Sequence, residues 1–392
     1  MRIAVFHDLP SGGAKRVLQA QLRGLGERGH ELLLFVPASA DESFLPTAPF
    51  VRQVTTLPLP APPDRARVLE GRPAPLDPLR WLAYLGRVHA AARKLAAAID
   101  DAACDVVLVH PSQFTQGPWV LRWLRTPTMY YCHEPLRAAY DPFVTTAWMR
   151  LLIRASLGRI DRRNVRAAGR VLANSRFTAE AVRAIYDVPA AVAYPGIDAE
   201  RFRPVNGIER QGLLTVGALL RIKGLDFIVR ALGRIPAAER PPLTVIADRG
   251  RAAERARLDR LASRSGVDLR LRTRVDDDAL IDAYARASIV LYAARNEPLG
   301  LVPLEAMACG RPVVAVADGG VVETVQDGVT GVLVPRDEER FAHAVAGLLR
   351  DPERADELGR NGLAMVRRDW TWEGAVDTLE RELAALAYGE KR

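Results

Sequence analysis

The chain has 392 residues, of which 49% are hydrophobic, and a formal net charge of +8. This length accommodates two domains of ordinary size, and the apolar content is too high for a disordered chain. No apolar run reaches the roughly 18 residues that a membrane-spanning helix needs, and residues 1–6 predict a buried strand rather than a signal peptide. Cys104, Cys132 and Cys309 lack the spacing of a metal or redox site, so we expect a cytoplasmic protein.

The positive charge lies in the first half of the chain. Residues 1–200 contain 25 Lys and Arg against 18 Asp and Glu, a net charge of +7, whereas residues 201–392 contain 30 against 29. An anionic membrane, an anionic acceptor or a nucleic acid could attract such a half. Basic and aromatic residues are not interleaved as in nucleic-acid-binding modules, so nucleic acid is not expected as a partner.

In the first half, strands and helices alternate along the chain. Strands are expected over residues 3–7, 31–36, 106–110 and 128–132, and helices over residues 14–27 and 79–98. Between them, residues 57–78 are rich in proline, which predicts a surface loop or a mobile flap.

The same alternation restarts after Pro204. Strands are expected over residues 213–216, 243–247, 288–292 and 313–317, and helices over residues 225–232, 252–264, 299–309 and 372–387. This spacing predicts parallel strands joined by right-handed crossovers. We therefore predict an α/β protein of two doubly wound halves, linked over about residues 194–212, with ligands at the carboxyl ends of the strands.

The most informative segment begins at Asn296 and places one glutamate before a helix and a second inside it. Glu297 lies in the loop and Glu305 about two turns within the expected helix. The first amides of a helix bind phosphate because they lack partners, and carboxylates accept hydrogen bonds from hydroxyls. Phosphates flanked by hydroxyl-bearing groups describe a nucleotide-sugar. Taken alone, each glutamate is also explained by a surface position or by complementing the helix dipole.

This string resembles the glutamate–seven residues–glutamate motif of the retaining family-4 glycosyltransferases. Further segments resemble motifs of that family and occur in its order: Ser11-Gly-Gly-Ala-Lys-Arg, Cys132-His-Glu-Pro, Ala173-Asn-Ser-Arg-Phe-Thr, Tyr194-Pro-Gly-Ile-Asp, Thr215-Val-Gly-Ala-Leu-Leu-Arg-Ile-Lys-Gly, Gly319-Gly-Val-Val-Glu and Asp327-Gly-Val-Thr-Gly-Val-Leu-Val. The resemblance implies the GT-B fold, with two Rossmann-like domains facing across a cleft. It implies an acceptor-binding domain over residues 1–200, a nucleotide-sugar-binding domain over residues 201–370, and a helix over residues 371–392 that crosses back to the first domain.

The resemblance also implies which residues bind the donor. Glu305 is expected on the nucleoside ribose and Glu297 on the transferred sugar, because two carboxylates on the diphosphate would repel it. The remaining donor-binding residues are expected to be Gly12, Gly13, Gly217, Gly300, Leu301 and Val302. Gly12 and Gly13 follow the first strand, where glycine lets the backbone approach a ligand or make a plain tight turn. No Gly-x-Gly-x-x-Gly is present, which removes the main support for a nicotinamide or flavin cofactor.

Three more residues are expected to take part in catalysis, together with Glu297. His133 occupies the position at which the family places a histidine near the donor sugar, although a lone histidine is often structural. Lys223 and Arg221 follow the strand at 213–216, where cations would neutralise the charge on the departing diphosphate. The family usually has an arginine where this chain has Ala218. Arg221 therefore either replaces that arginine or is a solvated surface charge.

Two charged stretches have competing interpretations. Asp276, Asp277 and Asp278 precede an expected helix, so we interpret them as helix caps rather than metal ligands, and no metal is expected. Residues 153–171 predict an amphipathic helix with Ile153, Leu157, Ile160, Ala168 and Val171 on its apolar face. Its opposite face would carry Arg159, Arg162, Arg163, Arg166 and Arg170, either as ordinary surface or as a dock for an anionic membrane leaflet.

Together these features predict a cytoplasmic, metal-independent, retaining hexosyltransferase without a cofactor. The donor is expected to be a UDP- or GDP-linked sugar and the acceptor a lipid-linked molecule or another glycan. The expected setting is the inner face of the cell membrane, in cell-surface glycan or glycolipid synthesis. One alternative is a phosphorylase-like GT-B enzyme, which would need a lysine-bound pyridoxal phosphate in a chain of four lysines. The other is a sugar-nucleotide-binding paralogue with weakened catalysis, which Ala218 favours.

Overall fold

The computed structural model describes residues 1–10, 12–38, 40, 42, 45–60, 78–112, 115–205, 207–247, 252–273 and 275–389. Most of the proline-rich stretch at 57–78 and Ser11 of the glycine-pair motif lie outside the described residues. The chain forms two compact units: unit 1 combines Met1–Tyr194 with the chain from Ala375 onward, and unit 2 is Pro195–Gly374.

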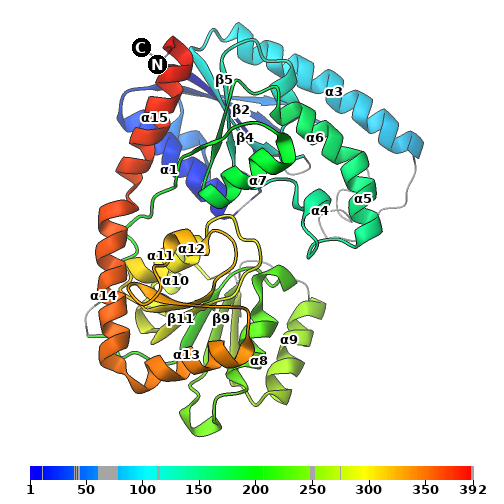
Figure 1. The fold of residues 1–392 in the computed structure, drawn as a ribbon. Coiled ribbons are helices and arrows are strands. Elements are labelled where there is room, and N and C mark those ends of the chain that lie inside the picture. Colours follow the sequence, from blue (N-terminus) through cyan, green and yellow to red (C-terminus); the bar gives the residue numbers. More distant parts are fainter. Residues whose placement is uncertain are drawn as a thin grey trace. The chain divides into compact units, whose positions relative to one another are not determined.

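Unit 1 contains a parallel sheet that seven described strands form in the order β3-β2-β1-β4-β5-β6-β7 (Figure 1). The strands are β1 (Arg2–Asp8), β2 (Glu31–Pro37), β3 (Gln53–Leu57), β4 (Val106–Ser112), β5 (Thr128–Cys132), β6 (Arg170–Ala173) and β7 (Ala191–Val192). Every residue of β4 and β5 is buried, as the near-continuous apolar runs of a sheet covered on both faces require. In the register, Ala4 of β1 pairs with Leu33 on one side and Val107 on the other.

Helices join these strands as crossovers. They are α1 (Gly13–Glu27), α3 (Pro78–Asp101), α4 (Arg137–Tyr140), α5 (Ala147–Ala155), α6 (Leu157–Val165) and α7 (Arg176–Tyr186), with short 3-10 turns η1 (Ala48–Phe50) and η2 (Trp119–Arg122). The strand order places β1 between β2 and β4, so successive connections leave β1 in opposite directions. That topological switch point, at the carboxyl ends of β1 and β4, is where open α/β sheets bind ligands.

The last helix, α15 (Trp372–Tyr388), is fixed to the rest of unit 1 from Ala375 onward. Val376 fills the space above Gly24 of α1, where an added Cβ would lie 2.6 Å from a Val376 methyl. Glu380 pairs with both Arg28 and His30, at 2.6 and 2.7 Å. Apolar contact and charge therefore both attach this helix to α1 and its following turn.

Unit 2 repeats the design with six described strands in the order β10-β9-β8-β11-β12-β13, all parallel (Figure 1). The strands are β8 (Leu213–Val216), β9 (Leu243–Ala247), β10 (Leu269–Thr273), β11 (Ile289–Tyr292), β12 (Val313–Val316) and β13 (Gly331–Val334). The helices and 3-10 turns are η3 (Arg221–Lys223), α8 (Leu225–Leu232), η4 (Ala237–Glu239), α9 (Ala252–Arg264), α10 (Asp277–Arg286), α11 (Leu301–Ala308), α12 (Val321–Thr324), α13 (Glu338–Arg350) and α14 (Pro352–Asp369). Its switch point lies between β8 and β11, so the loops after these two strands meet.

The two sheets confirm the predicted α/β class and its two doubly wound, Rossmann-like halves. Most expected elements appear within a few residues of their predicted limits. The helix expected over 299–309 begins only at Leu301, because Gly300 has a φ of 90°. Asp276 accepts a hydrogen bond from the amide of Ala279 at 2.8 Å and caps α10, as predicted for the aspartate run.

The single amphipathic helix expected over 153–171 is wrong. The chain forms α5, breaks at Ser156, forms α6 and then enters the sheet as β6. Ser156 leaves the helical conformation, with φ and ψ of -110° and -89°, and Gly158 lets α6 pack close to α4, where an added Cβ would lie 3.2 Å from the Tyr140 hydroxyl. Val171 is therefore a sheet residue that pairs with Tyr130, not part of a helix face.

The three cysteines are buried free thiols. Burial raises the pKa of each of them, in the case of Cys309 to about 12 with help from the nearby charge of Glu305. None of the described helices is both long and apolar enough to cross a bilayer. Within the described residues, no group of three or more His, Cys, Asp or Glu side chains is arranged to hold a metal ion.

Candidate functional site

The loops after β8 and β11 are joined at the switch point of unit 2. The amide of Arg295 donates to the carbonyl of Ile222 at 2.7 Å. Gly224, with a φ of 68°, packs so closely that an added Cβ would lie 2.0 Å from the carbonyl oxygen of Ala293. Only glycine fits there, so this residue allows the two loops to meet.

This contact brings Lys223 and Glu297 together. Lys223 Nζ donates to Glu297 Oε1 at 2.6 Å, and both side chains are half-buried. Gly217, at the end of β8, has a φ of 154°, and an added Cβ would lie 3.7 Å from the aliphatic part of Lys223. The structure thus unites three predicted site residues that are up to 80 positions apart in the sequence.

Residues 318–320 hold the loop that carries Glu297 in place through hydrogen bonds and close packing. The amide of Gly320 donates to the Glu297 carbonyl at 2.8 Å, and an added Cβ on Gly320 would lie 2.1 Å from the Pro298 carbonyl oxygen. Asn296 adopts a left-handed φ of 47° and donates its amide to Asp318 at 2.9 Å. These contacts fix the backbone on both sides of Glu297.

Arg336 completes this support, although sequence reasoning did not identify it. Its guanidinium pairs with Asp318 at 3.0 Å and donates to the carbonyls of Ala293 and Ala294 at 3.0 and 2.9 Å. A partly buried arginine is a strong positioning group when its guanidinium satisfies several acceptors at once, as here. No local pattern around Arg336 distinguishes it from the other arginines of an arginine-rich chain.

The N-terminus of α11 follows Glu297 directly. Gly300 is its N-cap, so the first amides of the helix belong to Leu301 and Val302. Such amides have no partner within the helix, and the helix dipole makes their surroundings positive. This end of α11 therefore has the properties of an anion site, beside the cation of Lys223.

Glu305 lies inside α11 and is buried. Its Oε2 accepts a hydrogen bond from the hydroxyl of Tyr284 on α10 at 2.7 Å. Tyr284 was not predicted as a site residue, since a tyrosine on an ordinary helix carries no sequence signal. It holds the carboxylate of Glu305 in one orientation.

The other predicted cation differs from Lys223 in its surroundings. Arg221 begins η3 and its side chain is exposed. Ala218, where the resemblance would place an arginine, is buried. Substitution of Arg221 for that arginine stays a prediction.

In unit 1, the predicted residues lie at the carboxyl ends of β1 and β5. Gly12, with a φ of 146°, precedes α1, and Gly13 is the first residue of that helix. Lys15 of the same helix is fully buried and pairs with Glu42 at 3.0 Å. Burial opposes ionisation of Glu42, but hydrogen bonds from His7, Thr47 and Lys15 outweigh it and hold its pKa well below the ordinary value.

His133 follows β5 and is paired with another histidine. Its Nε2 lies 3.1 Å from Nδ1 of His110, which was not predicted, and the His110 ring also stacks on Tyr131. Burial lowers the pKa of His133 to about 3. Burial, with the neighbouring His133 and His7, also lowers the pKa of His110 well below its ordinary value. Both rings are therefore neutral near pH 7, and one donates a hydrogen bond to the other.

The helices α5 and α6 carry a mixed surface. Trp148, Leu151 and Leu152 of α5 are 61%, 67% and 55% exposed, and Arg159 and Arg163 of α6 are exposed as well. Of the other predicted arginines, Arg166 pairs with Asp187, Arg162 lies 3.8 Å from the same carboxylate, and Arg170 pairs with Glu382 at 2.7 Å. These exposed apolar side chains of α5 were missed because the predicted helix began at Ile153, after all three of them.

In unit 2, the segment from Glu297 to Glu305 combines two carboxylates with the N-terminus of α11, and the Lys223 cation contacts it from the loop after β8. The comparisons with known families agree with this chemistry. The family model described as Glycosyltransferase Family 4 matches residues 11–201, and the one described as Glycosyl transferases group 1 matches residues 198–365.

Among curated proteins, the chain is 36% identical over 257 residues to D-inositol 3-phosphate glycosyltransferase 2 of Catenulispora acidiphila, covering 58% of this chain and 60% of that protein. It is 35% identical over 240 residues to D-inositol 3-phosphate glycosyltransferase of Kribbella flavida, covering 55% of this chain and 56% of that protein. The match thus spans little more than half the length of these relatives.

Solved structures share the fold at lower identity. Sucrose-phosphate synthase from Thermosynechococcus elongatus superposes with a TM-score of 0.75 at 22% identity, covering 98% of this chain and 99% of that one. Anabaena HepE in complex with UDP-glucose superposes with a TM-score of 0.74 at 18% identity, covering 98% and 100%. With its two family matches in succession and this fold, the chain belongs to the GT-B glycosyltransferases of the family 4 and group 1 type.

Proposed function

We propose that the protein is a retaining glycosyltransferase that moves a sugar from a nucleoside diphosphate sugar to an acceptor hydroxyl without a metal ion. The observation that carries this proposal is the contact between Lys223 and Glu297 at the N-terminus of α11, with Glu305 buried in the same helix. One segment of unit 2 then offers positive potential for a diphosphate and carboxylates for the groups on either side of it.

Each group has a distinct proposed role. The N-terminal amides of α11 bind the diphosphate, and Lys223 stabilises the charge that builds on it as the sugar leaves. Glu305, oriented by Tyr284, accepts hydrogen bonds from the ribose hydroxyls, and Glu297 accepts them from the transferred sugar. Retention follows if the leaving phosphate oxygen takes the proton of the acceptor hydroxyl on the face from which the donor departs. Lys223 and the N-terminus of α11 supply the electrostatic stabilisation that a metal ion would otherwise provide.

The names of the relatives support the donor class. HepE was crystallised with UDP and with UDP-glucose, and the curated relatives are named as glycosyltransferases. For this chain we propose a UDP- or GDP-linked hexose. The acceptor hydroxyl is proposed to belong to a lipid-linked molecule or a glycan.

A donor screen tests the proposal. Thermal shift and calorimetry with UDP- and GDP-hexoses should identify one stabilising donor, and NMR of the purified protein with that donor should show slow release of the sugar as its α-anomer, unaffected by EDTA. Binding without any turnover, even with a panel of acceptors, would instead indicate the non-catalytic paralogue. Turnover that requires inorganic phosphate and a bound pyridoxal phosphate would indicate the phosphorylase-like enzyme.

We also propose that unit 1 binds an anionic membrane surface. The supporting observation is the exposure of Trp148, Leu151 and Leu152 on α5 next to the exposed arginines of α6. Apolar side chains that enter the headgroup region and arginines that attract anionic lipids are the two components of interfacial binding. Such binding would bring a lipid-linked acceptor within reach of the enzyme.

A further inference from the structure

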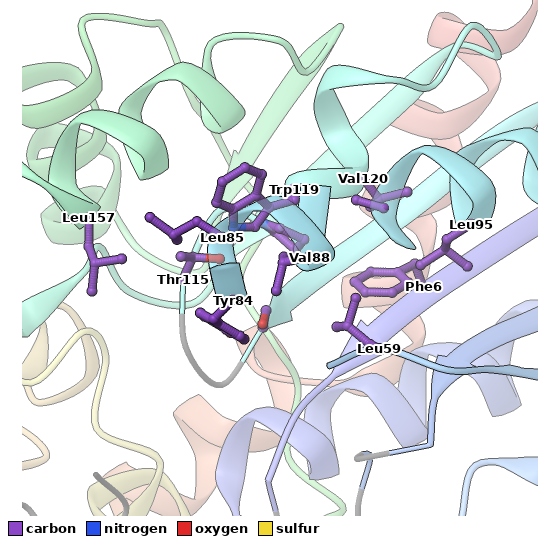
Figure 2. A pocket seen from close by; sticks show the side chains of 13 residues that line it. Phe6, Leu59, Tyr84, Leu85, Val88, Leu95, Thr115, Trp119, Val120 and Leu157 are labelled. Carbon is purple, nitrogen blue, oxygen red and sulfur yellow. The ribbon is translucent and has the colours of Figure 1, made fainter. Parts of the chain in front are cut away.

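Unit 1 contains a cavity of about 90 Å³ that no proposed role of the donor site uses (Figure 2). Its wall combines Phe6 of β1, Ser112 of β4, Tyr84 and Val88 of α3, Trp119 of η2 and Leu157 of α6. In Figure 2, Leu157 lies at one end of the group and Phe6 and Leu59 at the other.

The position of the cavity is that of a ligand site. Phe6 and Ser112 lie near the carboxyl ends of β1 and β4, the two strands on either side of the topological switch point of unit 1. In open α/β sheets the crevice at this point receives ligands because the loops diverge there. None of the residues expected to bind the donor lines this cavity, and Glu297 and Glu305 belong to unit 2.

The lining is mostly apolar, and its hydroxyl-bearing side chains are Tyr84, Ser112 and Thr115. None of the thirteen described lining residues is Lys, Arg or His. The Ser112 hydroxyl donates to Asp8 Oδ2 at 3.2 Å, so a buried carboxylate lies directly behind this part of the wall. Burial, with the negative charge of Asp8, raises the pKa of Tyr84 to about 12, and its hydroxyl remains a donor at neutral pH. Such a wall favours an alkyl group and disfavours a phosphate.

The wall is also held in place by buried hydrogen bonds. Between the lining residues Thr115 and Pro118, the amide of Gly117 donates to Asp161 at 2.6 Å. The carbonyl of Gly117 accepts from Asn164 at 2.9 Å, so α6 fixes this segment through both of its backbone groups. A cavity that is kept open by such contacts does not have to be formed by its ligand.

Building on the proposed function, we infer that this cavity receives a short alkyl segment of the acceptor, beside the hydroxyl-bearing part that Ser112 and Tyr84 contact. Apolar cavities of roughly 150 Å³ hold a benzene ring, so 90 Å³ suits a few methyl or methylene groups. The acceptor is therefore an alcohol joined to an apolar group, not a free polyol phosphate of the kind in the names of the curated relatives.

Alkyl glucosides used below their micelle-forming concentrations test the inference. Methyl, propyl, butyl and hexyl β-glucoside are titrated into the full-length protein by calorimetry, with saturation-transfer NMR to locate the bound protons. We expect affinity to rise about fourfold with each methylene until the cavity is full, with the strongest NMR signals on the alkyl chain. Equal affinity for all four glucosides would overturn the inference.

Two variants make the test specific. Ala92→Leu adds bulk to a lining position of α3 and should abolish the dependence on chain length, whereas Ala97→Leu makes the same change at an exposed position of the same helix and should preserve it. Leu157→Asp, at the other end of the cavity, should also abolish the dependence on chain length. It serves as the second lining variant in case Ala92→Leu folds poorly. An unchanged dependence in both lining variants would show that the alkyl chain binds elsewhere.

Donor turnover separates this inference from the proposed function. If the wild-type protein turns over its donor but binds all glucosides equally, the cavity proposal fails and the enzyme proposal stands. If it binds the longer glucosides better but never turns over a donor, the proposed function fails, and with it the assignment of the cavity to an acceptor.

Discussion

At the scale of single residues, the contact between Lys223 and Glu297 links two roles in donor binding. Lys223 is proposed to meet the diphosphate and Glu297 the sugar, yet without a ligand they neutralise each other at 2.6 Å. On these proposed roles, an arriving diphosphate would compete with Glu297 for the ammonium group of Lys223. The carboxylate would then become available for the sugar when the donor binds.

The two glutamates should differ in their effects on nucleotide binding. Glu305→Ala removes a charged acceptor from the ribose, a loss of about 1.5–3 kcal/mol, so the free nucleoside diphosphate should bind at least tenfold more weakly in calorimetry. Glu297→Ala should not weaken that affinity, and should reduce turnover instead. Identical affinities for free nucleotide in both variants would refute the division of roles.

Removal of the Lys223 charge should mainly affect the reaction rate. Its interaction with the leaving group strengthens in the transition state, so Lys223→Ala should lower kcat by about ten- to a thousandfold in steady-state kinetics while the Tm stays near that of the wild type. Arg221→Ala is the matched comparison on the same turn. Near wild-type activity in that variant would make Arg221 a surface charge, and a similar loss would make it the substitute for the arginine absent at Ala218.

The pair of His110 and His133 should make the fold sensitive to acid. Burial holds the pKa of His133 at about 3, whereas an unfolded histidine titrates near 6.5. Between these values the unfolded state binds more protons, so stability is lost as pH falls from 6.5, by up to about 1.4 kcal/mol per pH unit for each such histidine. Urea unfolding at pH 7.5 and 5.5 should show this loss, and His133→Gln should reduce it. The same loss in wild type and variant would assign it to other groups.

At the scale of elements, α6 connects two other segments of unit 1 through Asp161, a role that its sequence does not indicate. Asp161 is buried and accepts hydrogen bonds from the Gly117 amide and the Tyr186 hydroxyl, both at 2.6 Å. Burial raises the pKa of Asp161 to about 6, although these two hydrogen bonds favour its charged form. The helix thereby connects the segment before η2 to α7. An aspartate among four arginines gives no sign in the sequence of such a role.

Removing the Asp161 hydrogen bonds should lower the stability of the protein much more than removing a nearby surface charge. Asp161→Ala leaves two buried donors without acceptors, at about 1–3 kcal/mol each. We expect the free energy of unfolding of unit 1, measured by chemical denaturation, to fall by about 2–5 kcal/mol. Asp187→Ala, which removes an exposed partner of Arg166, should cost less than about 1 kcal/mol. Similar losses in the two variants would mean that Asp161 is not an organising contact.

The strengths and failures of sequence reasoning follow from the range of the interactions involved. The strand, loop and helix around Glu297 and Glu305 were predictable because periodicity, Gly300 and Gly310 are local signals. The partners Tyr284 and Arg336 were not, because they come from other elements and look like ordinary helix and loop residues. The continuous helix over 153–171 failed because the chain leaves the helical conformation at Ser156 and residues 170–173 join the sheet as β6, neither of which the apolar periodicity indicates.

At the scale of the whole molecule, charge is separated along the chain. The first 200 residues carry a net charge of +7 and the remainder +1. Part of the excess is neutralised within unit 1 by pairs such as Arg170 with Glu382. The exposed arginines of α6 add to this positive charge, and the exposed apolar side chains of α5 lie on the preceding helix. A surface of this kind favours anionic interfaces, with a strength that depends on salt.

Vesicle sedimentation measures this preference. We expect binding to anionic vesicles at low salt, weak binding to neutral vesicles, and release of most of the protein at high salt, since each basic residue near the surface contributes about 1 kcal/mol. Changing Arg159, Arg162, Arg163 and Arg166 to Glu should abolish binding, and Trp148→Ser with Leu151→Ser should weaken it without changing its salt dependence. Equal binding to neutral and anionic vesicles, or none to either, would favour a soluble acceptor.

The buried cysteines have a practical consequence for experiments on this protein. Cys104, Cys132 and Cys309 are shielded from solvent and their thiols remain protonated at neutral pH, so maleimide dyes should leave the folded protein almost unmodified. A cysteine introduced on an exposed helix, for example at Ala97 in unit 1 or Arg255 in unit 2, would then be the dominant site of labelling. Fluorescence energy transfer between two such dyes would report any change in the distance between the labelled sites when a donor is added, in a protein that keeps all of its natural thiols.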